Sequence, residues 1–306
     1  MRVGIVILPE HRWWAAEPKW RAAEEYGFDH AWTYDHLGFR SLVDGPWFSS
    51  VPTLTAAAMV TSTIGLGTFV ASPNFRHPVP FTRELITLDD IADGRLVLGL
   101  GSGVGAPEYD AVVLGEPELT ARQRADRFVE FTEALDGLLT TDRFDFQGAH
   151  YTARGARNLP GPVQRPRMPF VIAANGPRSM RLAARLGDGW VTTGRHRDDA
   201  ESWWKSLAEL SATFEETLDA LGRDRGSVRR YLMLDAGPVF SLSSVNAFTD
   251  NAGRAAELGF TDIIAHWPRA GDPYAGHESV LERVATDVLP GLTGRNPRPD
   301  DFPGGG

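Results

Sequence analysis

The feature that most constrains this chain is an alternation of short apolar runs with longer amphipathic segments. The runs are rich in β-branched and aromatic residues and too short for helices, which indicates buried strands. Strands that alternate with helices form parallel sheets, and eight such units close a (β/α)8 TIM barrel, which is the fold we expect. The eight predicted strands are 3–8, 30–35, 64–70, 95–100, 169–174, 189–193, 230–235 and 261–266.

One stretch departs from this alternation. Residues 141–169 begin with FDFQGAHYTA, which is typical of a hairpin around Gly148, and continue with a run too rich in proline and glycine for a regular element. The alternation resumes directly afterwards, so we expect an insertion inside one domain that spans 1–291, followed by a flexible tail over 292–306. The predicted helices are about 17–26, 52–61, 80–92, 121–139, 178–186, 199–221, 243–257 and 277–289.

Composition excludes several classes of function. With 42% hydrophobic and 23% charged residues, the chain has enough apolar side chains for a globular core. A net charge of -9, without a basic cluster interleaved with aromatic residues, argues against a nucleic-acid partner. The chain lacks both a long apolar window and a signal-peptide pattern, so we expect no membrane association and a cytoplasmic location. There is no cysteine and no histidine pair at metal-binding spacing, so we expect no metal site.

The glycine-rich stretch LGLGSGVGAP, residues 98–107, raises the question of nucleotide binding. Its frame GSGVGA, residues 101–106, satisfies the dinucleotide pattern GxGxxA. That fold also requires a helix at the loop and an acidic residue at the end of the next strand. Here the helical pattern begins only near Thr120, and Asp126 lies inside it. Around Ser102, Leu100 and Val104 stand where the nucleophile elbow GxSxG of a serine hydrolase requires glycines. We therefore interpret the loop as a sharp turn on the active-site face of the barrel.

A second loop is a better candidate for phosphate binding. A buried strand runs through Asn175, Gly176 and Pro177 directly into a helical pattern. Backbone N–H groups at a helix N-terminus, aided by the helix dipole, bind phosphate without a particular side chain. Arg178 would add a charge and Ser179 a hydroxyl. An ordinary asparagine-capped helix with proline near its first position has the same pattern, so both interpretations stand at this point.

Five motifs occur in order along the chain. They are Glu10 after the first strand, Tyr34-Asp35-His36 after the second, GTFVASPNFRHP (67–78), TLDDIADGRLVLGLGSG (87–103) and AANGPRSMRLAARLGDGWV (173–191). In this order and spacing the chain resembles the bacterial luciferase-like flavin and deazaflavin oxidoreductases, from residue 2 to residue 289. The resemblance implies a barrel that binds FMN or coenzyme F420 over the C-terminal ends of its strands.

The resemblance also implies where the cofactor lies. In this family a bulge with a non-proline cis peptide in the third strand supports the rear face of the ring, and here it would lie near Phe69-Val70. The implied ring contacts are Val70, Ala71 and Ser72. Room for the cofactor would come from Gly101, Ser102 and Gly103, and the phosphate would be held by Ala174, Asn175, Gly176, Pro177, Arg178 and Ser179.

The resemblance favours F420 over FMN, because YDHLG and NFRHP are more similar to the deazaflavin-dependent branch than to the FMN monooxygenases. Deazaflavins exchange hydride at one ring carbon, so the protein must supply a proton donor or acceptor for the substrate. A histidine oriented by a carboxylate suits that task. We expect His36 to be the acid/base, Asp35 its neighbour or a cofactor contact, and Glu10 a second proton carrier. The structural alternative for His36 is a buried histidine bonded to a carbonyl.

The substrate pocket is expected to differ from that of the sugar-phosphate dehydrogenases in this family. Those enzymes carry glutamate after the glycine loop and tryptophan four residues beyond the histidine, where this chain has Val104 and Arg40, so glucose 6-phosphate is not predicted. Arg76 is expected to be a structural ion-pair partner. Aromatic residues of the top-face loops would line a mouth for a flat or apolar substrate, or an oligomer interface. They are Trp13, Trp14, Phe39, Trp47, Phe48, Phe75 and Trp267.

The sequence thus predicts a coenzyme F420-dependent oxidoreductase that moves hydride between the deazaflavin and a small organic substrate. The family further implies a homodimer. One alternative is an FMN-dependent two-component monooxygenase that takes reduced flavin from a partner reductase. A second is a non-catalytic flavin-binding relative that keeps the barrel alone.

Overall fold

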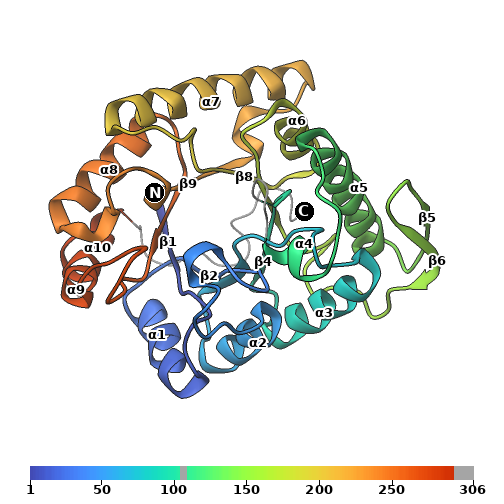
Figure 1. The fold of residues 1–306 in the computed structure, drawn as a ribbon, viewed down its shortest axis with the longest axis horizontal. Helices are drawn as coiled ribbons and strands as arrows, with labels where there is room; N and C mark the ends of the chain where they lie inside the picture. The colour runs from blue at the N-terminus through green and yellow to red at the C-terminus, as the bar shows by residue number, and fades with distance from the viewer. Residues whose placement is uncertain (104–108, 293–306) are drawn as a thin grey trace.

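The computed structural model describes residues 1–103 and 109–292, and its centre is a closed barrel of parallel strands (Figure 1). The strands pair in chain order, and the last closes onto the first with Arg2 opposite Asp262. All eight predicted strands are present, so the TIM-barrel prediction is confirmed. They are β1 (Arg2–Val6), β2 (His30–Thr33), β3 (Gly65–Thr68), β4 (Leu96–Leu100), β7 (Phe170–Ala173), β8 (Gly189–Thr192), β9 (Arg229–Met233) and β10 (Asp262–His266).

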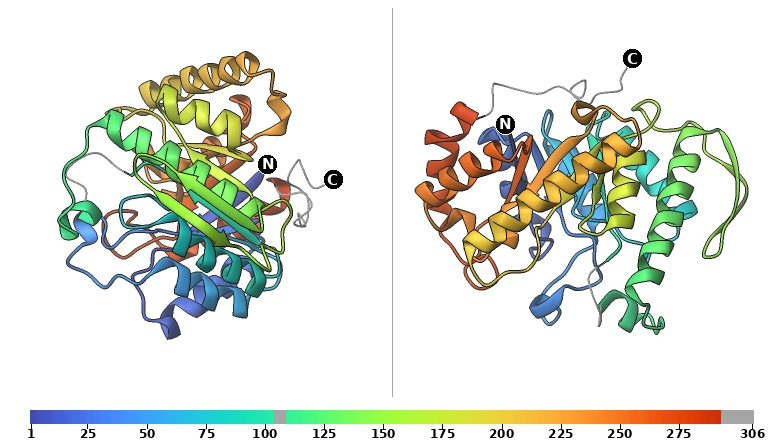
Figure 2. Two further views of the ribbon diagram at one scale, coloured as in Figure 1. Left: turned by 90° about the vertical axis from the view of Figure 1, so that its right-hand side faces the viewer. Right: turned by 90° about the horizontal axis from the view of Figure 1, so that it is seen from above.

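Helices surround the barrel on its outside (Figures 1 and 2). Each presents an apolar stripe to the strands; on α3, for example, Phe81, Leu85 and Leu88 are buried at helical spacing. The long helices are α1 (Trp13–Glu25), α2 (Ser50–Val60), α3 (Pro78–Ile91), α5 (Ala121–Thr140), α6 (Pro177–Leu186), α7 (Ala200–Ala220), α8 (Val245–Glu257) and α9 (Glu278–Asp287). None of the helices in the described ranges is long and apolar enough to cross a membrane.

Short helical elements complete the connections. They are α4 (Tyr109–Val113), α10 (Leu289–Leu292) and the 3-10 turns η1 (Arg40–Leu42), η2 (Arg225–Ser227), η3 (Leu234–Ala236) and η4 (Ser241–Ser243). The sequence predicted an irregular stretch where α4 lies, because five residues are too few to show a helical period. Within the predicted tail, 293–306 lie outside the described residues, as do 104–108 of the glycine loop.

The predicted insertion contains an antiparallel hairpin made of β5 (Arg143–Gln147) and β6 (Thr152–Arg157). It lies outside α5, away from the barrel strands (Figures 1 and 2). Gly137 of α5 leaves room for the Phe144 ring, since a Cβ at this position would overlap it. The hairpin around Gly148 is therefore confirmed, and it packs on the helix layer at a distance from the carboxyl ends of the strands.

The lower part of the barrel interior is filled by buried polar and aromatic side chains. Trp32 Nε1 donates to His30 Nδ1 at 2.6 Å, and His30 Nε2 lies 3.1 Å from Asp262 Oδ1. Gly4 is required beside them, because a Cβ there would overlap the His30 ring. Burial lowers the pKa of His30, so the neutral ring is favoured. This packing fills the lower part of the barrel, below the carboxyl ends of the strands.

Candidate active site

A cavity of about 960 Å³ lies above the carboxyl ends of the strands. Its walls come from the segments that follow β2, β3, β4, β7, β8 and β9, together with the first turn of α5 and Tyr274. Active sites of TIM barrels lie on this face, because the loops after the strands converge there. The placement of the glycine loop on the active-site face is therefore confirmed.

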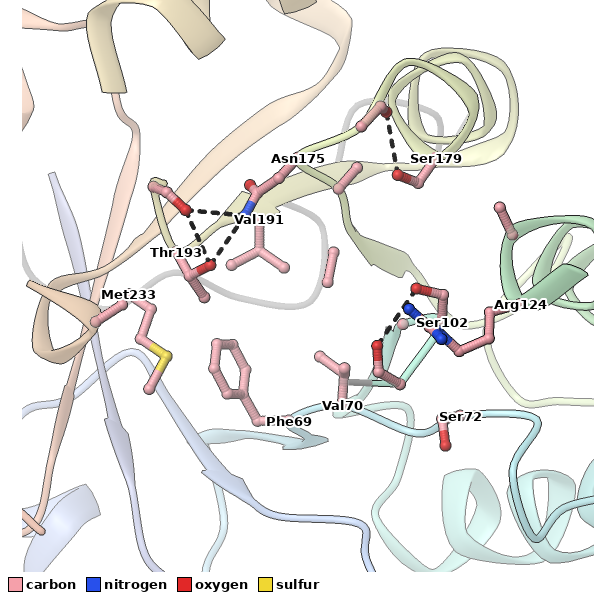
Figure 3. A pocket seen from close by; sticks show the side chains of 18 of the residues that line it. Phe69, Val70, Ser72, Ser102, Arg124, Asn175, Ser179, Val191, Thr193 and Met233 are labelled. Carbon is pink, nitrogen blue, oxygen red and sulfur yellow. Dashed lines mark hydrogen bonds between the residues drawn. The ribbon is translucent and has the colours of Figure 1, made fainter. Parts of the chain in front are cut away.

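The floor of the cavity is formed by Phe69 and Val70, which are joined by a non-proline cis peptide bond at the position the resemblance implied. Figure 3 shows both side chains on one side of the cavity. The Ala71 N–H donates to the carbonyl oxygen of Gly99, and the Gly101 N–H donates to that of Ala71, each at 2.8 Å. A Cβ on Gly101 would lie 2.5 Å from Val70 Cγ2, so glycine is needed to keep this floor in place. Ala71 itself is buried behind the floor.

The loop before α6 places backbone N–H groups at the opposite side of the cavity. The N-cap residue of α6 is Gly176, and no described side chain caps the helix. Asn175 does not act as the cap, because its Oδ1 accepts from the Thr192 hydroxyl at 2.6 Å. Its Nδ2 donates to Thr193 Oγ1 and to the Gly194 carbonyl, both at 3.0 Å (Figure 3). The Ser179 hydroxyl donates to the Gly176 carbonyl at 3.1 Å. The interpretation as an asparagine-capped helix is therefore wrong, and the first-turn residues Gly176 to Ser179 line the cavity without a side-chain cap from the described residues.

Arginines surround this end of the cavity. Arg122 and Arg124 at the start of α5 line it together with Arg178, and Figure 3 shows Arg124 across the cavity from Asn175. Arg178 pairs with Asp126 at 2.7 Å, while Arg124 donates to the Leu119 carbonyl at 2.7 Å. The rim is cationic although the chain as a whole is acidic, which suits a ligand that carries negative charge away from its ring.

The histidine of the YDH motif lines the cavity and is held by a carboxylate that the sequence did not indicate. His36 Nδ1 lies 2.6 Å from Asp110 Oδ2, and the Leu37 N–H donates to Asp110 Oδ1 at 2.7 Å. Asp110 is fully buried on α4. Because this carboxylate already accepts a backbone N–H, we assign the proton to His36 Nδ1, which leaves Nε2 toward the cavity as an acceptor. The partner of His36 is thus Asp110 and not Asp35.

Asp35 instead anchors an ion pair behind the cavity. Its two oxygens accept from Arg76 Nε and Nη2, each at 2.6 Å, and the Ser50 hydroxyl also donates to it. The predicted ion-pair role of Arg76 is confirmed. Asp35 is buried and does not line the cavity, because the arginine draws its carboxylate toward α2 and α3.

Glu10 also lies outside the cavity lining. Its carboxylate accepts from Arg269 Nε at 2.8 Å and from Nη2 at 2.7 Å. The same arginine donates to the carbonyl oxygens of Asp272 and Pro273 at 2.9 Å. Glu10 therefore fixes the loop that carries Tyr274, rather than reaching into the cavity.

Of the seven aromatic residues expected at the mouth, only Phe39 lines the cavity. Trp47 packs behind it and donates to the His36 carbonyl at 2.8 Å, and Trp267 donates to Glu278 Oε1 at 2.8 Å. The others lie on helix α1 or at the surface, because loop position alone does not fix the direction of a side chain. Trp13 packs on the core from α1, and Trp14 is 76% exposed. Phe48 is also exposed, and the Phe75 ring stacks with the Arg76 guanidinium.

The side chains that line the substrate end were not all predicted. Tyr34 was quoted only as part of a motif, whereas Met233, Asp235 and Tyr274 were not considered. Tyr34 follows β2, Met233 ends β9, Asp235 follows β9, and Tyr274 lies in the loop after β10. No local pattern marks them, and the signal available in the sequence was the position of the first three at the carboxyl ends of predicted strands, which is where side chains of a barrel reach the upper face.

Comparison with known proteins agrees with this geometry. Residues 1–271 match the model of the luciferase-like monooxygenase family. The F420-dependent glucose-6-phosphate dehydrogenase of Beutenbergia cavernae is 30% identical, over 89% of this chain and 91% of that protein. The 5,10-methylenetetrahydromethanopterin reductase of Archaeoglobus fulgidus is 30% identical, over 88% of this chain and 71% of the relative.

Solved structures share the fold. An F420-dependent secondary alcohol dehydrogenase in complex with an F420-acetone adduct superposes with a TM-score of 0.78 at 18% identity, covering 95% of this chain and 99% of the other. At that identity the likeness concerns the fold, whereas the family match spans most of the sequence. The chain therefore belongs to the luciferase-like monooxygenase family.

Proposed function

We propose that this protein is a coenzyme F420-dependent oxidoreductase that transfers a hydride between the deazaflavin and a small organic substrate. The observation that carries this proposal is the cavity itself: a flat floor at the Phe69-Val70 cis bond faces an uncapped helix N-terminus with arginines around it. The two relatives described above that are 30% identical to this chain are, by their names, an F420-dependent dehydrogenase and a reductase of a methanopterin compound.

The cavity residues fit a flat ring with an anionic tail. Val70 and Ser72 would contact the ring, with the backbone of Ala71 holding the floor in place. Gly101, Ser102 and Gly103 would border the ring on a second side. The tail would lie along Ala174, Asn175, Gly176, Pro177, Arg178 and Ser179, where α6 N–H groups and arginines offer positive charge. When bound, the deazaflavin supplies the ring carbon that accepts or gives up a hydride.

The protein side of the reaction is proton handling and orientation. His36 lines the cavity, and its Nε2 would accept or return the proton of a substrate oxygen, while Asp110 holds the ring in place through Nδ1. Asp35 and Glu10 serve as positioning residues, because their carboxylates are engaged by Arg76 and Arg269. Phe39 would exclude water beside His36, since the two rings lie 5.0 Å apart.

The first experiment is an anaerobic titration of the purified protein with F420 and, separately, with FMN, each in its oxidised and reduced form. We expect saturable tight binding of F420 and weak binding of FMN. Strong preference for FMN would overturn the proposal in favour of the two-component monooxygenase.

The second experiment is a panel of alcohols, carbonyl compounds and sugar phosphates, in which turnover is measured by loss or gain of the absorbance of the oxidised deazaflavin. His36→Ala should lower turnover about 10²–10⁴-fold for a substrate whose oxygen lies beside His36, while leaving F420 binding within a few-fold. An absence of turnover by the wild-type protein with every compound would favour the non-catalytic alternative.

A homodimer is also part of this proposal. The neighbouring helices α1 and α2 carry Trp14, 76% exposed, and Met59, 72% exposed, and large exposed apolar side chains are common at subunit interfaces. Light scattering on the eluted protein checks the assembly, and a monomer would contradict it. Two expectations stay predictions from the sequence: a partner protein that reduces or reoxidises the cofactor, and a cytoplasmic location.

A further inference from the structure

A second chain of titratable groups meets the same cavity on the side of β2, β9 and β10. Tyr34 Oη lies 2.9 Å from His266 Nε2 and 3.0 Å from Tyr274 Oη. His266 Nδ1 lies 2.9 Å from Asp235 Oδ2. Tyr34, Asp235 and Tyr274 line the cavity, whereas His266 is completely buried behind them. The mechanism above does not use any of these groups.

The hydrogen bonds of Asp235 fix the direction of this chain. Its Oδ2 accepts the backbone N–H of His266 at 2.6 Å, and its Oδ1 accepts that of Ser241 at 2.8 Å. A carboxylate held in this way accepts a further bond, so we assign the proton of the neutral His266 ring to Nδ1. His266 Nε2 is then an acceptor, and the Tyr34 hydroxyl must donate to it. Tyr34 Oη in turn accepts from the Tyr274 hydroxyl, which leaves a lone pair of Tyr274 Oη for a ligand in the cavity.

Burial favours the neutral form of every ring in this chain. It lowers the pKa of His266, with the Asp235 hydrogen bond acting in the opposite direction, so a neutral imidazole is available as a base. Burial raises the pKa of Tyr34 and of Tyr274, so both phenols stay protonated. The remaining charged or titratable groups near the two tyrosines are Arg40 and Arg269, together with His36, whose ring lies 6.2 Å from that of Tyr34.

The position of Tyr274 suits a proton relay. Its ring stacks on His266 with centroids 3.6 Å apart and an interplanar angle of 10°, so the face of the ring would stabilise a positive imidazolium. Its backbone has φ 70°, a left-handed conformation that is uncommon outside glycine. The Arg269 N–H donates to the Tyr274 carbonyl at 2.9 Å, so the arginine held by Glu10 keeps this loop in place.

We propose that the Tyr274 hydroxyl is a second proton-transfer group of the site, and that Tyr34, His266 and Asp235 form the relay behind it. In the oxidative direction the substrate C–H bond would break and its hydrogen would pass with both electrons, as a hydride, to the deazaflavin. The one O–H proton would pass to Tyr274 Oη when the substrate oxygen lies beside Tyr274, and to His36 Nε2 when it lies beside His36. Tyr274 gives its own proton to Tyr34, and Tyr34 gives its proton to His266 Nε2. The substrate becomes a carbonyl compound, the deazaflavin is reduced, and the proton rests on His266 beside Asp235. This inference rests on the proposed function.

The direction of the relay is tested without any substrate. Histidine labelled with ¹⁵N reports by NMR which ring nitrogen carries the proton. We expect the Nδ1–H form for His266 in the wild-type protein at neutral pH, with the signal assigned by its loss in His266→Asn. Tyr34→Phe should shift the Nε2 resonance, because the ring loses its donor, whereas Tyr26→Phe should not, because Tyr26 packs outside the barrel against Trp267 and is not a member of this chain. An Nε2–H form would overturn the proposal, because Tyr34 would then be the acceptor.

The contribution to turnover is tested with Tyr274→Phe, which keeps the ring stacked on His266 and removes only the hydroxyl. Tyr26→Phe is the matched control. The probe reaction is oxidation of propan-2-ol, or of any alcohol that the panel identifies, by F420 under anaerobic conditions. Proton transfer by a positioned side chain contributes about 10²–10⁴-fold, so with His36 still present we expect kcat to fall about tenfold to a hundredfold. The KM for alcohol and the dissociation constant for F420 should change by less than about threefold.

The pH profile separates this relay from a structural role. Removing Tyr274 disconnects His266 from the substrate, so the acidic limb of the kcat profile should move in Tyr274→Phe and in Tyr34→Phe alike. Turnover and a pH profile equal to those of Tyr26→Phe would overturn the relay while leaving the proposed function intact. Failure of the wild-type protein to bind F420 would instead refute the proposed function.

Discussion

The ion pair between Asp35 and Arg76 gives a sharp test of which carboxylate beside His36 takes part in chemistry. The side chains of Asp35 and Arg76 are 1% and 9% exposed, and two bonds of 2.6 Å join them. In Asp35→Ala the guanidinium stays buried and keeps the Ser50 hydroxyl at 3.3 Å and one carboxylate, that of Glu84 at 2.8 Å, whose side chain is 47% exposed. The Ser50 hydroxyl loses its acceptor as well.

The size of the effect follows from this geometry. Removal of one partner of a buried ion pair costs about 3–5 kcal/mol, since the other charge is left uncompensated. Glu84 compensates part of the charge, so we expect a loss at the lower end, about 3 kcal/mol in the free energy of unfolding. Unfolding entropy is about 2.1 cal/mol/K per residue, which for 306 residues gives about 0.6 kcal/mol/K. The melting temperature should therefore fall by about 5 °C.

Urea denaturation followed by tryptophan fluorescence measures the free energy, and calorimetry measures the melting temperature. The double variant Asp35→Leu with Arg76→Met removes both charges and should recover most of the loss, because apolar replacement of a buried pair is often neutral. F420 affinity of Asp35→Ala, measured below its melting range, should stay within about threefold of wild type. An unchanged melting temperature with abolished cofactor binding would refute this account and restore Asp35 as a cofactor contact.

Three further perturbations test the site and the barrel. Asp110→Asn removes a charge-assisted bond worth about 1.5–3 kcal/mol, so kcat should fall about 10- to 100-fold in steady-state assays; a loss of F420 affinity alone would contradict this role. Gly101→Ala places a Cβ 2.5 Å from Val70 Cγ2 and should weaken F420 binding, measured by titration, at least about tenfold. Gly176→Ala is the control, because the atom nearest to its new Cβ is 3.9 Å away, and it should change F420 binding little. Burial lowers the pKa of His30, so below pH 6.5 the unfolded chain binds more protons than the folded one. The free energy of unfolding should therefore keep its full value well above pH 6.5 and decrease as the pH falls below it. A urea midpoint that is the same at pH 8 and at pH 5.5 would contradict this expectation.

Part of the candidate site could be predicted because it is encoded in contiguous motifs. The cis bond at Phe69-Val70, the glycines of residues 101–103 and the loop from Asn175 to Ser179 each lie in one short segment after a predicted strand. His36 was found in the same way. Asp110 was not, because it lies 74 residues beyond His36 on a helix of five residues that has no periodic signal.

Side-chain direction was the other quantity that sequence reasoning missed. Trp267 is the first residue after β10 and Asp235 the second after β9, yet the tryptophan packs toward the outer helices and the aspartate reaches the cavity. Glu10 follows β1, but the charge of Arg269 holds it at the rim. Which way such side chains point depends on partners supplied by other strands.

The sequence by itself determined the barrel, the order of its strands and the loops that meet at its upper face, since hydrophobic period and turn residues are local properties of the chain. Only the tertiary structure decided which carboxylate pairs with which histidine or arginine side chain. Asp110 on His36, Asp35 on Arg76 and Asp235 on His266 join residues from different units of the barrel. Such pairs form because closure of the sheet brings distant strand ends within hydrogen-bond distance, and no local pattern records that distance.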